Sequence, residues 1–262
     1  MPTNVKGVPP GAPVITPPLG MWNVIPAGTT KGSVTPANPK ALSSAKGPQF
    51  QAAYTLSKSL DQASSFEETV NPFNPALSRA LSLFNSSQRF VVSYFWDLPI
   101  PKHEGWVGKV VNDWAVSGIT EFQTGFPIRL SEQDDSELLS SAFFTSITGP
   151  QLTGPFQIEN PKSNGAYYFN PASFSDAPPG QLATTRRSIC CGPGLNNWDF
   201  SVHKLIPFSE TKYMQFRVEI FNAFNRTGFI NPDGDFSDGA QFGQVTQARD
   251  PRLVQLALKY FF

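Results

Sequence analysis

The sequence predicts an all-β fold, namely six antiparallel strands of a transmembrane β-barrel with long external loops and a disordered N-terminal segment. Two observations predict it. Segments of about ten residues alternate between apolar and polar side chains, as a strand does when one face meets lipid and the other meets water. The connections between these segments alternate between long and short, which is typical of barrels with long external loops and short periplasmic turns.

The composition narrows the class of protein. The chain has 262 residues, of which 20 are basic and 20 acidic, so its zero net charge gives no electrostatic basis for binding nucleic acid. Its two cysteines, Cys190 and Cys191, are adjacent, and neither their number nor their spacing suits a zinc site or a disulfide framework. Two free thiols in a loop are the simpler interpretation, and a disulfide between the neighbours is the alternative in an oxidising compartment.

Residues 1–48 differ in composition from the rest. They contain ten prolines and no acidic residue, and no alternation is sustained among them. Such a segment cannot bury enough apolar surface to fold alone, so we expect it to be disordered or loosely attached. The abrupt change also leaves open a misassigned gene start, since no secretory signal pattern follows Met1. Residues 49–262 form the predicted β-domain.

The first three predicted strands lie between residues 50 and 130. A long polar connection, Ser59–Ser87, separates the first from the second, which ends at Pro99 because proline cannot donate to a ladder. The third strand is long, and Gly118, Gly125 and Pro127 predict a bulge or an overhang past the bilayer. The predicted apolar faces are Phe50, Ala52, Tyr54 and Leu56; then Phe90, Val92, Tyr94, Trp96 and Leu98; then Trp114, Val116, Phe122, Phe126, Ile128 and Leu130.

The last three strands follow a very long connection, Ser131–Asn196. A loop of this length is usually functional or partly folded, and Tyr167–Pro171 predicts local order near its end. A tight turn at Pro207–Lys212 joins the fourth strand to the fifth, and Asn225–Pro251 leads to the sixth. The predicted apolar faces are Trp198, Phe200 and Val202; then Met214, Phe216, Val218 and Ile220; then Val254, Leu256, Leu258, Tyr260 and Phe262.

Aromatic residues near the strand ends favour a membrane barrel. Amphipathic rings settle at membrane interfaces, and in an up-and-down order such residues gather at both ends of the strands. A soluble β-sandwich is the alternative, because its inner faces are also apolar, but it does not need connections of such unequal length. The residues expected near one interface are Trp96, Trp114, Tyr213 and Tyr260, and those near the other are Phe90, Phe126 and Trp198.

Several motifs in the second half of the chain carry a family resemblance. They are GPGLNNWD at Gly192–Asp199, FRVEIFNAFN at Phe216–Asn225, FGQV at Phe242–Val245 and ARDPR at Ala248–Arg252. Earlier pieces agree, namely Tyr54–Ser59, Tyr94–Pro99, Ser117–Thr120 and Gln123–Pro127. In content and order these motifs resemble the C-terminal end of TonB-dependent receptors, with the Oar-like barrels as the nearest subgroup.

The resemblance implies a barrel of 22 strands in the whole family member, preceded by a plug domain and a segment that contacts TonB. It covers residues 49–262, and this sequence departs from the family pattern because the plug, the TonB-contact segment and most strands are not in it. The implied partners are outer-membrane lipid and the barrel-assembly machinery, with TonB as a partner of a full-length relative alone. The residues that resemble the barrel-assembly signal are Phe262, Tyr260, Leu258, Leu256 and Val254.

The sequence shows no arrangement of residues typical of an enzyme, a metal site or a cofactor site. His103 and His203 have no partner pattern and are interpreted as solvated polar residues. The acidic segment Asp233–Gly239 fails as a calcium loop, because its sixth position is Asp238 and its twelfth is Gln244. The polar residues expected to face the lumen, where they could touch a solute, are Asn197, Asp199, Ser201, Gln215, Arg217, Glu219, Gln255 and Lys259.

We therefore expect a fragment of a TonB-dependent outer-membrane receptor for nutrient uptake or ligand binding, not an enzyme and not competent for transport alone. Six strands would leave two unpaired edges in a bilayer that offers no water to satisfy them. Two alternatives remain at this point. One is a small porin or adhesin barrel built by oligomerisation, and the other is a soluble β-sandwich binding module. The sequence does not identify the small-molecule or polymer ligand.

Overall fold

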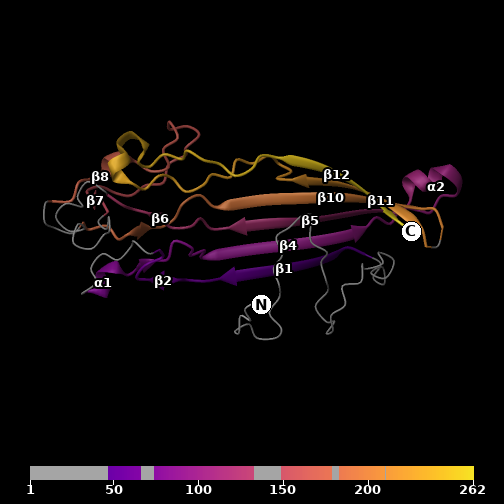
Figure 1. The fold of residues 1–262 in the computed structure, drawn as a ribbon, viewed down its shortest axis with the longest axis horizontal. Helices are drawn as coiled ribbons and strands as arrows, with labels where there is room; N and C mark the ends of the chain where they lie inside the picture. The colour runs from indigo at the N-terminus through magenta and orange to yellow at the C-terminus, as the bar shows by residue number, and fades with distance from the viewer. Residues whose placement is uncertain (1–46, 66–73, 133–148, 179–182, 210) are drawn as a thin grey trace, which may run out of the picture. The chain divides into compact units, whose positions relative to one another are not determined.

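The structure is a computed structural model that describes residues 47–65, 74–132, 149–178, 183–209 and 211–262. These residues belong to one compact unit, Ala45–Phe262. The predictions made for residues 1–48 therefore lie almost wholly outside the described residues. One six-stranded antiparallel sheet dominates the described part (Figure 1). Its strands, in spatial order, are β1 (Gln49–Leu56), β4 (Gln88–Asp97), β5 (Trp114–Gln123), β10 (Leu195–Pro207), β11 (Tyr213–Phe221) and β12 (Leu253–Phe261).

The register of the sheet aligns the predicted apolar residues of all six strands on one face, which we call the apolar face. Because side chains alternate along each strand, one register row is enough to fix the face of every other residue. One row runs across the whole sheet through Phe50, Tyr94, Gly118, Phe200, Ile220 and Val254. The opposite side, which we call the polar face, carries the interleaved polar residues.

Among the described residues, no second layer of protein covers the apolar face. Phe50 is 77% exposed, and Leu256 and Leu258 are 66% and 64% exposed. A soluble sheet of this size would bury such residues against another element. The six strands also form a single sheet, and the other sheets among the described residues have two short strands each. The alternative of a soluble β-sandwich is therefore wrong for the described part of the chain.

The third strand is shorter than predicted. It ends at Gln123, and the Thr124 hydroxyl then hydrogen-bonds with the backbone of Gln88. Gly125 leaves the sheet at a point where a Cβ atom would lie 1.7 Å from the Gly192 carbonyl oxygen. Ile128 and Leu130, predicted on the apolar face, are 1% and 2% exposed inside the connections instead. The prediction failed because apolar alternation continues past the point where the chain changes partner.

The long connections pack together at the end of the sheet opposite the C-terminus, in what we call the loop layer (Figure 1). Its short elements are β2 (Leu60–Asp61), α1 (Pro75–Ser78), β3 (Ala80–Leu81), β6 (Ile128–Arg129), β7 (Gln151–Leu152), η2 (Pro171–Ser173), β8 (Phe174–Ser175), β9 (Ser188–Ile189) and η3 (Phe236–Gln241). Its buried core is Ile128, Leu130, Tyr168, Phe169, Phe174, Phe242 and Val245. The order predicted at Tyr167–Pro171 is thus confirmed, since Phe169 lies at the centre of this core with no exposed surface.

Helix α2 (Gly105–Val111) lies at the other end of the sheet, between β4 and β5 (Figure 1). The sequence predicted only a connection here, because seven residues after two prolines give too short a pattern to identify a helix. The helix ends at Asn112, whose backbone N–H donates to the Gly108 carbonyl oxygen. In the described residues, no helix has both the length and the apolar character needed to cross a membrane.

Candidate functional site: the polar face and the loop layer

The polar face gathers the residues that the sequence predicts to face the lumen. Ser201, Glu219 and Gln255 form one row across β10, β11 and β12. Gln215 and Lys259 are direct register partners four residues further along the strands. Asn197 and Asp199 share this face on β10 by alternation, as does Arg217 on β11. All eight predicted residues therefore lie on one side of the sheet.

An ion pair on β11 holds two of these residues together. The Nη1 atom of Arg217 lies 3.1 Å from Oε1 of Glu219, and the two side chains point the same way because they are two residues apart in a strand. Their side chains are 15% and 2% exposed. A charged group this deeply buried usually has a charged or hydrogen-bonded partner, and Arg217 is that partner for Glu219.

The polar face also contains pairs that the sequence analysis did not identify. Arg89 on β4 donates to Glu121 on β5 over 2.6 Å. Ser117 on β5 and Nε2 of His203 on β10 share a hydrogen bond of 2.9 Å, so His203 is not simply a solvated residue. The alternation already placed Glu121 and His203 on this face, but pairing requires the register between strands, which a single sequence does not supply.

Asp199 has a structural role at the end of the sheet. Its Oδ1 atom accepts hydrogen bonds from the Asn197 amide at 3.0 Å and from the Asn222 backbone N–H at 2.8 Å. Asn222 has a positive φ of 47° and in turn contacts the backbone of Arg226 and Asp250. Asp199 thus fixes the point where β11 ends and the fifth connection begins.

In the loop layer, Arg187 ties the third connection along the chain, Ser131–Asn196, to the first, Ser59–Ser87. Its guanidinium group pairs with the Asp61 carboxylate, and the Arg187 side chain is 4% exposed. It also donates to the Ser78 carbonyl oxygen at 3.0 Å and to the Ser64 hydroxyl at 3.1 Å. Burial lowers the pKa of Arg187 from its usual value, but a guanidinium stays charged at any physiological pH. The next residue, Ser188, donates to the Leu81 carbonyl oxygen at 2.7 Å.

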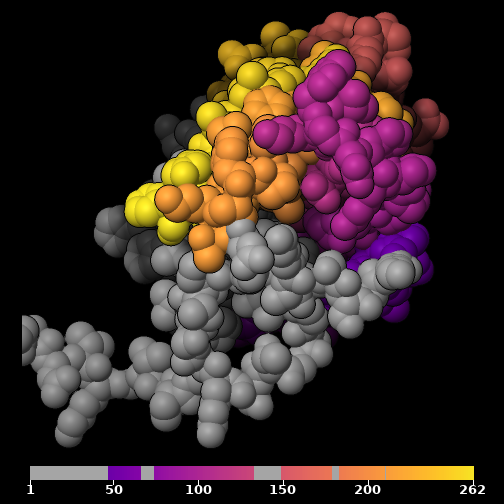
Figure 2. Space-filling view, turned by 90° about the vertical axis from the view of Figure 1, so that its right-hand side faces the viewer, coloured from indigo at the N-terminus to yellow at the C-terminus, as the bar shows by residue number. Residues whose placement is uncertain are grey.

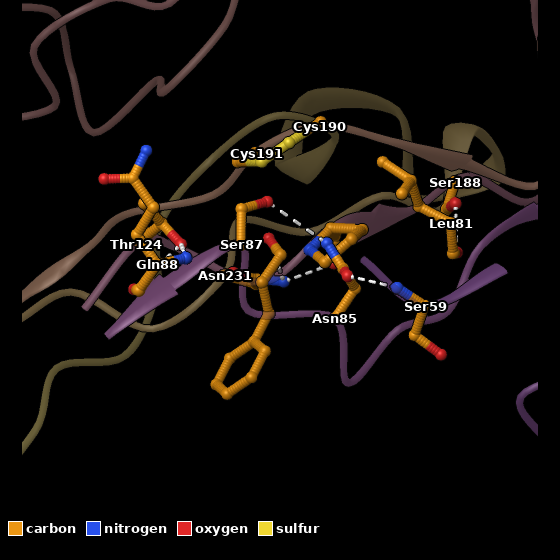
Figure 3. Close-up of a disulfide and its surroundings, with 12 residues drawn as sticks. Ser59, Leu81, Asn85, Ser87, Gln88, Thr124, Ser188, Cys190, Cys191 and Asn231 are labelled. Atoms are coloured by element: carbon orange, nitrogen blue, oxygen red, sulfur yellow. Dashed lines mark hydrogen bonds between the residues drawn. A yellow bond between two sulfur atoms is a disulfide. The ribbon is translucent and has the colours of Figure 1, made fainter. Parts of the chain in front are cut away.

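Tyr168 makes a contact within the third connection (Ser131–Asn196), and Asn231 ties the fifth connection (Asn225–Pro251) to the segment after β5. The Tyr168 hydroxyl donates to the Cys191 carbonyl oxygen at 3.0 Å, and burial raises the pKa of Tyr168. The Asn231 amide donates to the Pro127 carbonyl oxygen at 2.8 Å and lies where a Cβ on Gly192 would be. The close-up in Figure 3 shows Asn231 among residues of the first and third connections.

Cys190 and Cys191 are joined by a disulfide (Figure 3). The simpler interpretation of the sequence, two free thiols, is therefore wrong, and the alternative of a disulfide between neighbours is the one that the structure contains. Spacing alone could not decide between them, because adjacent cysteines are compatible with both states. Cys190 is exposed at the surface of the loop layer.

The acidic segment of the fifth connection is organised by its own backbone. Oδ1 of Asp233 accepts from the Asp235 N–H at 2.9 Å, and Oδ1 of Asp235 accepts from the Ser237 N–H at 3.1 Å. A hydrogen bond and charge repulsion from Asp233 raise the pKa of Asp238. Within the described ranges, no group of three or more His, Cys, Asp or Glu side chains is arranged to hold a metal ion.

Comparison with known proteins identifies the family. The model of a family described as an outer membrane beta barrel domain matches residues 42–255, which is well over half of the chain. No curated protein and no solved structure matches the chain. The matched range spans β1 to β11 and the beginning of β12, so it covers both the sheet and the loop layer. The chain belongs to the outer membrane beta barrel domain family.

Proposed function

We propose that this chain is the C-terminal part of a TonB-dependent, Oar-like receptor barrel that takes up a nutrient or binds an external ligand. The loop layer is the observation that carries the proposal. The connections Ser131–Asn196 and Asn225–Pro251 share a buried aromatic core, and Arg187 pairs with Asp61 of the connection Ser59–Ser87. Loops that are fixed in this way on a rigid sheet give a surface of the kind on which a receptor binds a ligand. The motif resemblance at Gly192–Asp199 and Phe216–Asn225 points to the same receptor class.

The polar face would form part of the wall of the barrel interior. The polar face contains two ion pairs, Arg89 with Glu121 and Arg217 with Glu219, and within each pair the positive and negative charges cancel. A wall of this kind suits the passage or retention of a polar solute and does not select one sign of charge. Lys259 lies on the exposed terminal strand β12 and adds one basic group to this wall. The proposal assigns no enzymatic activity and no cofactor to any of these residues.

The chain alone would not transport. In the described residues, β1 and β12 each have a hydrogen-bonded neighbour on one side only. The free edges present backbone N–H and C=O groups that the bilayer core cannot satisfy, so further strands must pair with them. We propose that the remaining strands of a receptor supply this pairing, and that energy comes from TonB in such a receptor.

The end of β12 would be read by the barrel-assembly machinery during insertion. Phe262 is 93% exposed beyond the last strand, and the alternate residues before it remain accessible on the apolar face. Tyr260 and Phe262 stack on each other with ring centroids 6.0 Å apart. The family resemblance implies such a signal, which consists of an aromatic residue at the terminus and apolar residues at alternate positions before it. Here those alternate positions include Leu258, Leu256 and Val254.

The proposal is tested in the cells that make the protein. An antibody against the loop layer detects every polypeptide that carries this sequence in separated outer-membrane, inner-membrane and soluble fractions. We expect the signal in the outer membrane, on a polypeptide that is crosslinked to TonB in living cells. An outer-membrane signal with no TonB crosslink, on a species that stays oligomeric in cold detergent and dissociates on boiling, would refute the receptor and support the alternative of an oligomeric porin or adhesin.

One observation favours the alternative of an oligomeric porin or adhesin. The same two open edges that a receptor would fill could also pair between copies of this chain, since β1 and β12 are both regular strands of eight and nine residues. Crosslinking at the edges separates the two cases. A disulfide that forms between single cysteines on β1 and β12 of different copies supports the oligomer and argues against the receptor.

A further inference from the structure

Helix α2 presents an apolar stripe that nothing in the described residues covers. Trp106 is 77% exposed, Val110 58% and Val107 36%. Residues 106, 107 and 110 lie on one side of a helix, since positions three and four apart are neighbours. Gly108 is on the opposite side and packs closely, because a Cβ there would lie 2.0 Å from the His103 carbonyl oxygen. The helix thus packs through its glycine and turns its large apolar residues outward.

The helix that carries the stripe is bonded to two side chains of the apolar face of the sheet. The indole N–H of Trp114, at the start of β5, donates to the Val110 carbonyl oxygen at 2.8 Å. The Lys204 ammonium donates to the Asn112 carbonyl oxygen and lies 5.9 Å from the centre of the Trp114 ring. Trp114 and Lys204 are register partners on the apolar face. Their contacts therefore hold α2 against the end of the surface that meets lipid in a membrane barrel.

The position of α2 along the strands is that of a membrane interface. Trp96, next to the end of β4, is 38% exposed on the apolar face, and its register partner Val116 is two residues from Trp114. Tryptophan gathers at this level because its ring is apolar and its N–H is polar. Figure 1 shows α2 just beyond this end of the sheet, and Figure 2 views the molecule from that end.

We propose that α2 is an interfacial anchor that lies in the headgroup region of the leaflet at this end of the strands, with Trp106, Val107 and Val110 inserted among the lipids. An amphipathic helix binds such a surface through its buried apolar area and its basic side chains. Lys102 and Lys109 are exposed beside the stripe and reach the headgroups. The inference needs a barrel in a membrane, but it does not depend on the receptor function proposed above.

Fluorescence quenching tests the inference in the full chain. The outer-membrane protein that carries this sequence, in which further strands or further copies pair with β1 and β12, is reconstituted in vesicles of phosphatidylethanolamine and phosphatidylglycerol. The vesicles contain phospholipid brominated either near the headgroup or near the end of the acyl chain. The contribution of Trp106 is the difference between the emission of the chain and that of its Trp106→Phe variant. Trp198→Phe is the matched control, because Trp198 lies on the apolar face towards the other end of β10.

We expect lipid brominated near the headgroup to quench Trp106 more strongly than lipid brominated deep in the bilayer, and aqueous iodide to quench it weakly. Val110→Ser, which removes part of the stripe and leaves the Gly108 contact intact, should shift the emission of Trp106 to longer wavelength without loss of strand signal in circular dichroism. Quenching of Trp106 by iodide and not by brominated lipid, while Trp198 is quenched by brominated lipid, would overturn the anchor. Quenching of neither tryptophan by brominated lipid would overturn it together with membrane insertion of the sheet.

Discussion

Replacing Arg187 with methionine should loosen the loop layer and leave the sheet intact. Arg187→Met keeps most of the side chain's volume but removes the pair with Asp61 and the hydrogen bonds to Ser78 and Ser64. Breaking a buried ion pair by removing one partner costs about 3–5 kcal/mol. Because the Asp61 side chain is 21% exposed and can recruit water, we expect the lower end of this range, about 3 kcal/mol.

Hydrogen exchange with mass spectrometry measures this loss locally. At about 1.4 kcal/mol for each factor of ten, 3 kcal/mol corresponds to roughly a hundredfold faster exchange of amides that open with the loop layer. Those amides include Ser82, which donates to the Ser59 carbonyl oxygen, and Leu83, which donates to the Ser64 hydroxyl. Amides in the centre of β10 and β11 should exchange at unchanged rates.

A neighbouring arginine supplies the control. Arg186 is exposed, so Arg186→Met removes the same charge from the same loop and leaves the contacts of Arg187 with Asp61, Ser78 and Ser64 in place. Equal exchange in the two variants would refute the role given to Arg187. Asp61→Asn, alone and combined with Arg187→Met, completes a double-mutant cycle, and additive effects would show that the two side chains are not energetically coupled.

Three further predictions concern other parts of the molecule. Gly118→Ala should destabilise the sheet by about 1–3 kcal/mol in urea unfolding from detergent, because its Cβ would lie 2.5 Å from the Tyr94 hydroxyl and the Asp199 carbonyl oxygen; a change below the scatter of the Gly154→Ala control would contradict this. Phe242→Ala should cost the loop layer about 3–5 kcal/mol, measured by exchange of its amides, and unchanged protection would show that the aromatic core is not what holds the layer. Burial raises the pKa of Tyr168 in the folded state, so the layer should lose stability as pH rises above the ordinary tyrosine pKa of about 10, and Tyr168→Phe should lessen that loss; an equal loss in both proteins would exclude Tyr168 as its cause.

The strands were predictable from the sequence because each carries its own periodicity. In β11, Met214, Phe216, Val218 and Ile220 alternate with polar residues, and the structure places them together on the apolar face. The polar face followed from the same parity, so its members were predictable too. Which of them pair was not, because the bond between Ser117 and His203 joins residues 86 positions apart.

The alternation of apolar and polar residues did not predict the loop layer or α2, for two different reasons. Ile128 and Leu130 continue the alternation of β5, and alternation alone does not distinguish a residue facing lipid from one buried among loops. Arg187 donates a hydrogen bond to the Asp61 carbonyl oxygen, 126 positions away in the sequence, so no local pattern predicts this contact. Helix α2 has only seven residues, and its stability comes from contacts such as the one between Trp114 and Val110.

In an outer membrane beta barrel the apolar face of this sheet should meet lipid and the polar face should meet water, and spin labelling distinguishes the two environments. A nitroxide is attached in turn to each position from 254 to 260 on β12, in a Cys190→Ser, Cys191→Ser background reconstituted in vesicles. We expect an alternation of period two, with Leu256 and Leu258 accessible to oxygen dissolved in lipid and Gln255 and Lys259 accessible to a water-soluble nickel chelate. Nickel access at every position, or no alternation at all, would show that the two faces are not divided between lipid and water.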